Sequence, residues 1–300
     1  MISDPISISY GSTSAQFAIT GAELVRLRHN GTDFLWNGDP KWWDFCAPIL
    51  FPVIGRSPND TIRVDGKPHP MPPHGFARDR EFRLIAQSPC SATFELSADS
   101  RTLAMFPFEF RLRISASIGD ARIAITASIE NPGFAPIPFC FGYHPAFVWP
   151  QAQATREDFV CQFENNETFD VRRPNPASGL IGTSAIPTPI QERELRLRDS
   201  LFEDGALLFD TLSSRKIWFG SKNSQGILVS FPNSPHLGIW TKPGAPFLCI
   251  EPWQGLAERE GGDGEISRRP GATILAPGQV KEYRLVVDLD VPSLREIAHA

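Results

Sequence analysis

The chain has 300 residues, of which 41% are hydrophobic, and 34 acidic against 29 basic side chains give it a formal net charge of −5. This mixed, slightly acidic composition disfavours a nucleic-acid-binding protein, which normally has a basic surface. No apolar run approaches the roughly 20 residues that span a bilayer, and residues 1–5 lack the charged start and apolar core of a signal peptide. We therefore expect a cytoplasmic protein with no nucleic-acid or membrane partner.

The 28 prolines and 23 glycines recur throughout the chain and leave little room for long helices. Short runs with a period of two residues instead predict many strands. In chain order these runs are 6–10, 83–86, 92–96, 110–115, 122–126, 216–219, 227–231, 237–241, 247–251 and 283–289. The Gly119-Asp120 turn predicts a hairpin between the fourth and fifth of them, and residues 293–299 are the one stretch that favours a helix.

Many short strands separated by turns are typical of a sandwich or barrel. Residues 172–189 are rich in Pro, Ser and Gly, but this stretch is too short to separate two domains. We predict an all-β protein, one large antiparallel β-sandwich domain that covers residues 1–300.

The five cysteines form no C-x-x-C pair, which disfavours a zinc knuckle or a thioredoxin-like motif. Cys140 lies between two phenylalanines and Cys249 between a leucine and an isoleucine. Such neighbours indicate small buried hydrophobic residues. Reduced thiols fit the expected cytoplasmic location.

Two loop segments offer polar side chains in fixed directions. Arg56 follows a glycine at the end of an apolar run, which can deliver a cation to a sheet edge. His74 follows two prolines and precedes Gly75, so its direction is set by a stiff approach and a tight turn. Each is also compatible with an ordinary surface arginine or loop histidine.

Two further segments place titratable groups among apolar ones. His144 follows the aromatic pair Phe141 and Tyr143, which could form the wall of a ligand site. Glu251 ends an apolar run, with Trp253 beside it to stack on a sugar. A lone buried carboxylate is costly and burial favours its use as a base near neutral pH. A core histidine, and a structural ion pair between Glu251 and an arginine such as Arg56, are the alternatives.

As an ordered set, these segments resemble the aldose 1-epimerases of the galactose mutarotase-like superfamily, in particular the LacX-like branch. The similarity runs from about residue 21 to residue 289. The segments that carry it are Leu50-Phe51-Pro52 with Gly55-Arg56, His74-Gly75-Phe76-Ala77-Arg78, Phe141-Gly142-Tyr143-His144-Pro145 and Glu251-Pro252-Trp253.

The resemblance implies a large twisted β-sandwich, the galactose mutarotase-like supersandwich, with an open cleft across one sheet. It implies that Glu251 removes the anomeric hydroxyl proton, that His144 is the general acid at the ring oxygen, and that His74 polarises the ring-oxygen side. Arg56 would hold sugar hydroxyls, and no metal or other cofactor is needed. The sugar-binding aspartate of the galactose enzymes has no secure counterpart, with Asp204 and Asp210 as candidates.

We therefore expect an aldose 1-epimerase, an isomerase that interconverts the α and β anomers of a small-molecule sugar, as a monomer or homodimer. The residues expected to bind or convert the sugar are Glu251, His144, His74, Arg56, Trp253, Phe141, Tyr143 and Arg78.

Four alternatives stay open. A hexose-6-phosphate 1-epimerase would use Arg78 and Arg80 to hold the phosphate. A non-catalytic carbohydrate-binding protein would need the aromatic residues without the acid and base. A metal-dependent isomerase or oxygenase would use His74, His144 and Glu251 as ligands. A glycoside hydrolase needs two facing carboxylates, and Glu258 and Glu260 resemble solvated loop charges.

Overall fold

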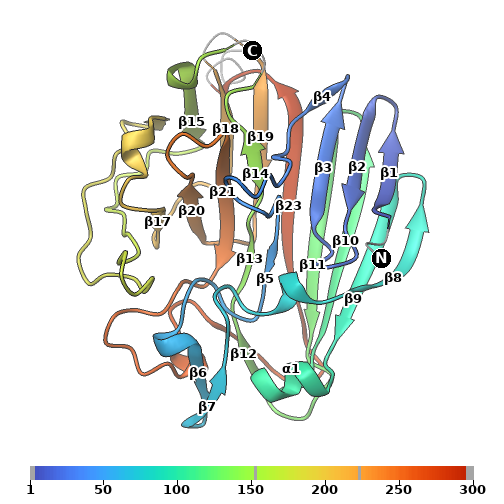
Figure 1. Ribbon diagram of the computed structural model, residues 1–300, viewed down its shortest axis with the longest axis vertical. Helices are drawn as coiled ribbons and strands as arrows, with labels where there is room; N and C mark the ends of the chain where they lie inside the picture. Colours follow the sequence, from blue (N-terminus) through green and yellow to red (C-terminus); the bar gives the residue numbers. More distant parts are fainter. Residues whose placement is uncertain (1–3, 152–153, 222–223, 295–300) are drawn as a thin grey trace.

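The computed structural model describes residues 4–151, 154–221 and 224–294. Its largest sheet has nine antiparallel strands (Figure 1). In sheet order these are β16 (Glu194–Arg196), β15 (Phe159–Phe163), β18 (Lys216–Ser221), β19 (Gly226–Ser230), β23 (Val280–Val291), β11 (Arg122–Glu130), β10 (Arg111–Gly119), β9 (Ser91–Ser97) and β8 (Arg83–Ser88).

Two further sheets supply most of the opposite layer. The first has the order β17 (Leu207–Phe209), β20 (His236–Trp240), β21 (Phe247–Gln254), β13 (Phe141–Tyr143) and β5 (Ile49–Leu50), and β14 (Ala146–Val148) also pairs with β21. The second has the order β1 (Ile6–Tyr10), β2 (Thr13–Phe17), β3 (Leu24–His29) and β4 (Thr32–Asp33). We call the first of these the six-stranded sheet.

The small elements surround these layers. Two-stranded pairs are formed by β12 (Ile137–Phe139) with β22 (Thr273–Leu275), and by β6 (Thr61–Val64) with β7 (Lys67–Pro70). The α-helix α1 is Ser100–Met105, and single 3₁₀ turns are Pro58–Asp60, Ala77–Asp79, Arg156–Asp158, Asp199–Leu201 and Ile266–Arg268. Along the described residues, no helix has the length and apolar character needed to cross a membrane.

The hairpin of β10 and β11 illustrates why the nine-stranded sheet forms. Leu112, Ile114 and Ala116 alternate with polar residues along β10, and every second side chain is buried. Because successive strand residues point to opposite faces, this alternation gives the sheet one apolar and one solvated face. β1 and β2 pack on β9 and β10, while Tyr143 of β13 reaches the backbone of β11 and β23. The core therefore lies between the two layers.

All ten predicted strands are confirmed, as is the antiparallel all-β fold. The turn at Gly119 joins β10 and β11 in register, with Gly119 opposite Arg122. The predicted helix at 293–299 lies mostly outside the described residues. The sequence interpretation missed α1, although Asp99 caps it in a reciprocal pair with Thr102.

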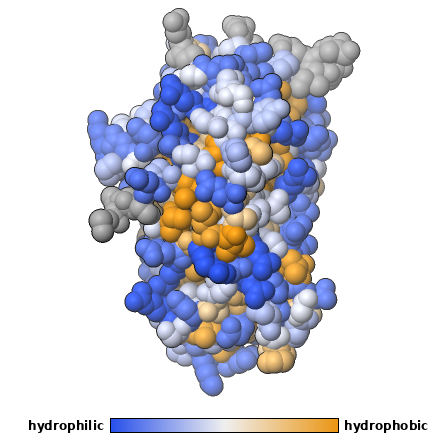
Figure 2. All heavy atoms as spheres, turned by 90° about the vertical axis from the view of Figure 1, so that its right-hand side faces the viewer, coloured by the Kyte–Doolittle hydropathy of each residue, from blue (hydrophilic) through white to orange (hydrophobic). Residues whose placement is uncertain are grey.

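The surface beyond β1 and β8, on the right of Figure 1, is mostly hydrophilic, with one apolar group near the middle of that face (Figure 2). Tyr10 of β1 and Ile85 of β8 are among the exposed apolar side chains. The chemistry-bearing residues gather elsewhere, on the six-stranded sheet.

Candidate active site

One cavity of about 360 Å³ collects residues from all four sequence segments. It lies over the six-stranded sheet, where β20, β21 and β13 adjoin. Its lining is Trp43, Ile54, Gly55, Arg56, Pro73, His74, Arg78, His144, Pro174, Gly179, Gly205, Ala206, Leu208, Trp240, Glu251, Trp253 and Ala257. Its volume lies in the range of small-molecule sites.

A second groove of about 530 Å³ lies beside β3 and β4 and has a different character. Its charged side chains are Arg26 and Asp33, which pair with each other at 2.8 Å. These two side chains already satisfy each other, so we assign the chemistry to the smaller cavity, where titratable groups face open space.

Glu251 and His144 form a direct pair on the cavity floor. Glu251 lies within β21, which continues to Gln254 beyond the predicted end of the strand. His144 lies in the two-residue gap between β13 and β14, both of which pair with β21. His144 Nε2 is 3.0 Å from Glu251 Oε2, and the side chains are 8% and 3% exposed. Glu251 therefore pairs with a histidine and not with an arginine, which was the alternative.

His74 stands beside this pair, with its ring centroid 5.6 Å from that of His144. Its backbone has φ +66°, and the next residue must be glycine because a Cβ on Gly75 would lie 2.1 Å from the Phe51 carbonyl oxygen. The Gly55 N–H donates to His74 Nδ1 at 3.2 Å. In a neutral ring the proton is then on Nε2. Burial, with the nearby His144 next, lowers the pKa of His74 well below its usual value, so the ring is a neutral donor.

Two tryptophans that the sequence interpretation missed enclose His144. The Trp43 ring lies 4.8 Å from the imidazole at an angle of 31°, and Trp240 lies edge-on at 6.1 Å. Glu23 fixes the segment that carries Trp43, because its carboxylate accepts the N–H groups of Cys46 and Ala47 at 2.6 and 2.8 Å. Burial raises the pKa of Glu23. The adjacent Trp42-Trp43 pair was the available sequence signal.

Trp253 lines the cavity, as predicted, and two glycines on neighbouring strands make room for its ring. A Cβ on Gly142 of β13 would lie 2.5 Å from Trp253, and one on Gly238 of β20 would lie 2.7 Å from it. The buried indole Nε1 has no hydrogen-bond partner among the residues that the structure describes. A Cβ on Gly142 would lie 3.1 Å from this nitrogen, so the N–H lies against β13 and is not accessible from the cavity.

Arg56 and Arg78 both reach the cavity. Arg56 is half-exposed and pairs with Asp60 at 3.3 Å. Gly179, with φ +69°, lets the 172–189 loop pass over the Arg56 side chain, which a Cβ there would approach to 2.6 Å. Arg78 lies over the Phe45 ring at 4.8 Å. Within the described part of the chain, its buried Nε has no hydrogen-bond partner, and its ion-pair contact is with Asp79 at 3.8 Å.

Arg269, also missed, holds the Arg56 segment in place. It is 2% exposed, and its guanidinium donates to the carbonyl oxygens of Ile54, Arg56 and Leu256 at 2.5, 2.9 and 3.0 Å. These bonds tie the loop after β5 to the loop after β21, which together form one side of the cavity. Burial lowers the pKa of Arg269.

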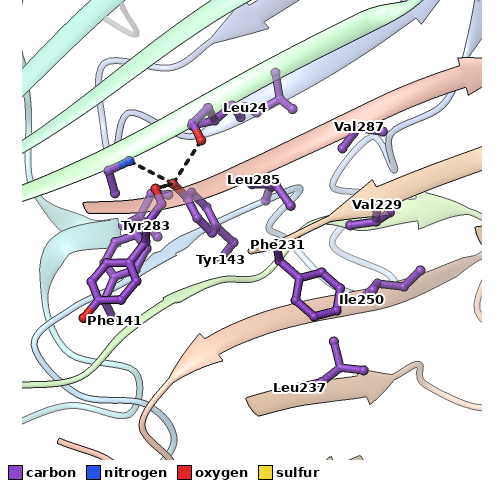
Figure 3. Packing of buried hydrophobic residues seen from close by; sticks show 14 of the residues in the cluster. Leu24, Phe141, Tyr143, Val229, Phe231, Leu237, Ile250, Tyr283, Leu285 and Val287 are labelled. Carbon is purple, nitrogen blue, oxygen red and sulfur yellow. Dashed lines mark hydrogen bonds between the residues drawn. The ribbon is translucent and has the colours of Figure 1, made fainter. Parts of the chain in front are cut away.

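Phe141 and Tyr143 lie in the core and not in the cavity, so the structure does not support them as sugar contacts. Phe141 stacks on Tyr283 at 5.0 Å and 11°. The Tyr143 hydroxyl accepts the Ala127 N–H at 2.9 Å and donates to the Tyr283 carbonyl at 2.8 Å (Figure 3). The reason is strand alternation: Gly142, between them, points to the cavity side, where Trp253 covers it.

The other charged candidates lie outside the cavity lining. Asp210 pairs with Arg172 at 2.5 Å, and Asp204 is exposed, while the intervening Gly205, Ala206 and Leu208 line the cavity. Arg80 donates to Met105 Sδ at 3.5 Å.

Glu260 accepts from Asn175 at 2.7 Å. Glu258 is 5% exposed, so its prediction as a solvated charge is wrong. Its carboxylate folds back onto the backbone N–H of Arg259 at 2.9 Å, which is how it is accommodated.

A possible metal set differs from the one that the sequence suggested. Within the described chain, the ligand atoms of His144, Cys249 and Glu251 all lie within 4.8 Å of one another. His74, which the sequence suggested as a ligand, is not in this group. The cysteines at 46, 90, 140, 161 and 249 are free, and of these only Cys90 is exposed.

Comparison with known proteins identifies the family of the chain. The sequence model of the aldose 1-epimerase family matches residues 4–287. Protein LacX of Lactococcus lactis subsp. lactis is 29% identical over 275 residues, which cover 88% of this chain and 92% of LacX.

Two solved structures are similar along nearly their whole length. A galactose mutarotase-like protein from Lactobacillus casei ATCC 334 superposes with a TM-score of 0.89 at 28% identity, covering 95% of this chain and 99% of that one. A galactose mutarotase related enzyme from Lactobacillus acidophilus gives 0.87 at 27% identity, covering 97% and 100%. The chain therefore belongs to the aldose 1-epimerase family and has the galactose mutarotase-like fold.

Proposed function

We propose that this protein is a mutarotase that interconverts the α and β anomers of an aldose, with Glu251 as base and His144 as acid. The observation that carries the proposal is the 3.0 Å contact between the two side chains on the cavity floor. In a cyclic aldose, O1 and the ring oxygen are bonded to the same carbon. A base for one and an acid for the other must therefore stand side by side, as these do.

The reaction needs two coupled proton transfers. Glu251 takes the O1 proton while His144 donates a proton to the ring oxygen, and the C1–ring-oxygen bond breaks to leave a free aldehyde. Rotation about the C1–C2 bond then presents the other carbonyl face. Glu251 returns its proton to O1 and His144 recovers its own as the ring closes. Both groups end in their starting protonation states.

The remaining cavity residues bind and orient the sugar. His74, neutral and protonated on Nε2, can donate to the ring-oxygen side without competing for the O1 proton. Arg56 supplies donors for sugar hydroxyls. Trp43, Trp240 and Trp253 supply apolar walls for the faces of the ring.

A second candidate, a 1-epimerase for a phosphorylated hexose, is favoured by Arg78. This guanidinium is 18% exposed and has a buried Nε without a partner. Burial lowers its pKa, which means that its charge is poorly solvated. An anionic substituent on the sugar would compensate this charge through the accessible part of the guanidinium. A non-catalytic carbohydrate-binding protein would use the same donors but would not need the acid–base pair.

Polarimetry of freshly dissolved α-glucose, α-galactose and their 6-phosphates tests the proposal. We expect the protein to speed the approach to anomeric equilibrium for at least one of them above the buffer rate. A preference for a phosphate that falls roughly tenfold or more in Arg78→Gln would identify the second candidate. If these sugars bind but none of them reaches anomeric equilibrium faster than in buffer, the protein is a non-catalytic carbohydrate-binding protein.

A further inference from the structure

A cysteine thiol lies directly beside the Glu251–His144 pair and has no part in the proposed reaction. Cys249 precedes Glu251 by two residues on β21, so both side chains point to the same face of the sheet. It packs in a cluster with Trp36, Ala146 and Phe247, against which Trp43 and Trp240 also pack. The last two line the cavity, so the thiol lies under the cavity floor.

The three side chains form a compact set of metal ligands. A thiol sulfur, an imidazole nitrogen and a carboxylate oxygen lie within 4.8 Å of one another, and all three residues are buried. Zinc takes these three ligand types at about 2.0–2.3 Å, which places the ligand atoms of a tetrahedral site roughly 3.5 Å apart. Side-chain movements of about 1 Å would therefore bring them to a shared ion.

We propose that His144, Cys249 and Glu251 form a three-ligand site for a thiophilic divalent cation such as Zn²⁺, and that occupancy of this site inhibits the enzyme. The fourth position faces the cavity, open to water or a sugar hydroxyl. The thiol proton leaves to solvent as the metal–sulfur bond forms. The ion occupies a ring nitrogen of His144 and a carboxylate oxygen of Glu251, so the acid–base pair that the proposed reaction needs is no longer available while it is bound.

The ligand set selects the class of cation. Mg²⁺ and Ca²⁺ require six or more oxygen ligands, and this site offers one carboxylate. Soft thiolate and imidazole ligands favour Zn²⁺ and related ions. Cys161 is equally buried, in β15, but belongs to no such group within the described residues. Burial of a cysteine in this fold therefore does not by itself create the site.

Cobalt and zinc titrations of the metal-stripped protein test the proposal without relying on activity. Wild type should bind one Co²⁺ with a thiolate-to-cobalt charge-transfer band in the near ultraviolet. Cys249→Ala should lose the band and bind Zn²⁺ at least about tenfold more weakly by calorimetry. Cys90→Ser, which removes the exposed thiol, should behave as wild type. Cys249→Ser provides a near-isosteric second variant if the alanine variant does not fold, and it too should lose the band.

The absence of the band in wild type at saturating Co²⁺, or its persistence in the Cys249 variants, would overturn the site. If sugars are interconverted, Zn²⁺ should inhibit the reaction and EDTA should restore it, with inhibition weakened by at least about tenfold in the Cys249 variants. Equal inhibition of wild type and these variants would overturn the inhibitory role. The spectra decide on the site even if the protein proves not to be a mutarotase.

Discussion

Carboxylates occupy two very different settings in the two main sheets. On the outer face of the nine-stranded sheet, Glu130 pairs with Arg111 at 2.7 Å, and both are partly exposed. On the six-stranded sheet, Glu251 is 2% exposed and its partner is a histidine. β10 alternates buried and accessible residues, whereas seven of the eight residues of β21 are buried. A charge on a solvated face needs no special explanation, but one on a strand covered on both sides does.

The largest expected effect follows from neutralising the covered carboxylate. Glu251→Gln keeps the shape and one acceptor oxygen but cannot take the O1 proton. We expect the polarimetric rate to fall nearly to that of the uncatalysed reaction while sugar affinity by calorimetry stays within several-fold of wild type.

Glu130→Gln is the matched control on the solvated face. We expect an unchanged rate and a stability change of less than about 1 kcal/mol. A Glu251→Gln variant as fast as wild type on every sugar it binds would remove Glu251 from the mechanism.

Two buried histidines sharpen the comparison further. His144→Gln keeps a polar side chain but removes the transferable proton, and we expect a loss of about 10² to 10⁴ in rate with circular dichroism unchanged. His29, buried in β3, is held by Thr13 Oγ1 at 2.8 Å. His29→Gln should change stability and leave the rate alone. An unfolded His144→Gln protein would mean that His144 is a structural core residue.

Tyr143→Phe separates core from cavity on a single strand. The change removes a buried hydroxyl that accepts from the Ala127 N–H and donates to the Tyr283 carbonyl, which should lower the free energy of unfolding by about 1–3 kcal/mol. Urea denaturation should show a lower midpoint with an unchanged m-value. The affinity for sugar should remain that of wild type, and a large loss of affinity at unchanged stability would place Tyr143 in the binding site after all.

The smallest effect is a pH dependence of stability that comes from His74. Burial lowers its pKa in the folded protein, while the unfolded chain keeps a value near 6.5. Below about pH 6.5 the unfolded state takes up a proton that the folded state does not. The free energy of unfolding therefore decreases as the pH is lowered below this value, by at most ~1.4 kcal/mol per pH unit. Above about pH 6.5 the stabilisation is fully present.

His74→Asn tests this, because asparagine tolerates a positive φ. Denaturant unfolding of both proteins at pH 7.5 and 5 should show the variant losing less stability than wild type on acidification. Parallel losses in the two proteins would show that His74 titrates normally in the folded state.

The local sequence determined the strands and the main chemical groups. Alternation and turns predicted the β10–β11 hairpin and eight other strands, since both signals reside in neighbouring residues. The four ordered segments also contained Glu251, His144, His74, Arg56 and Trp253, all of which line one cavity.

Tertiary structure decided which side chains share that cavity. Phe141 and Tyr143 are close to His144 in the sequence, yet strand alternation places their side chains in the core. There Phe141 stacks on Tyr283 and Tyr143 donates to its carbonyl oxygen. Trp43 reaches His144 across about a hundred residues of chain.

Arg269 joins two loops more than 200 residues apart in the sequence. From its sequence neighbours, Cys249 is interpreted as a small buried hydrophobic residue. Its proximity to His144 in the structure makes it a possible metal ligand. A sequence pattern reports the period of the local backbone, whereas such contacts depend on how the sheets pack on each other, to which residues along the whole chain contribute.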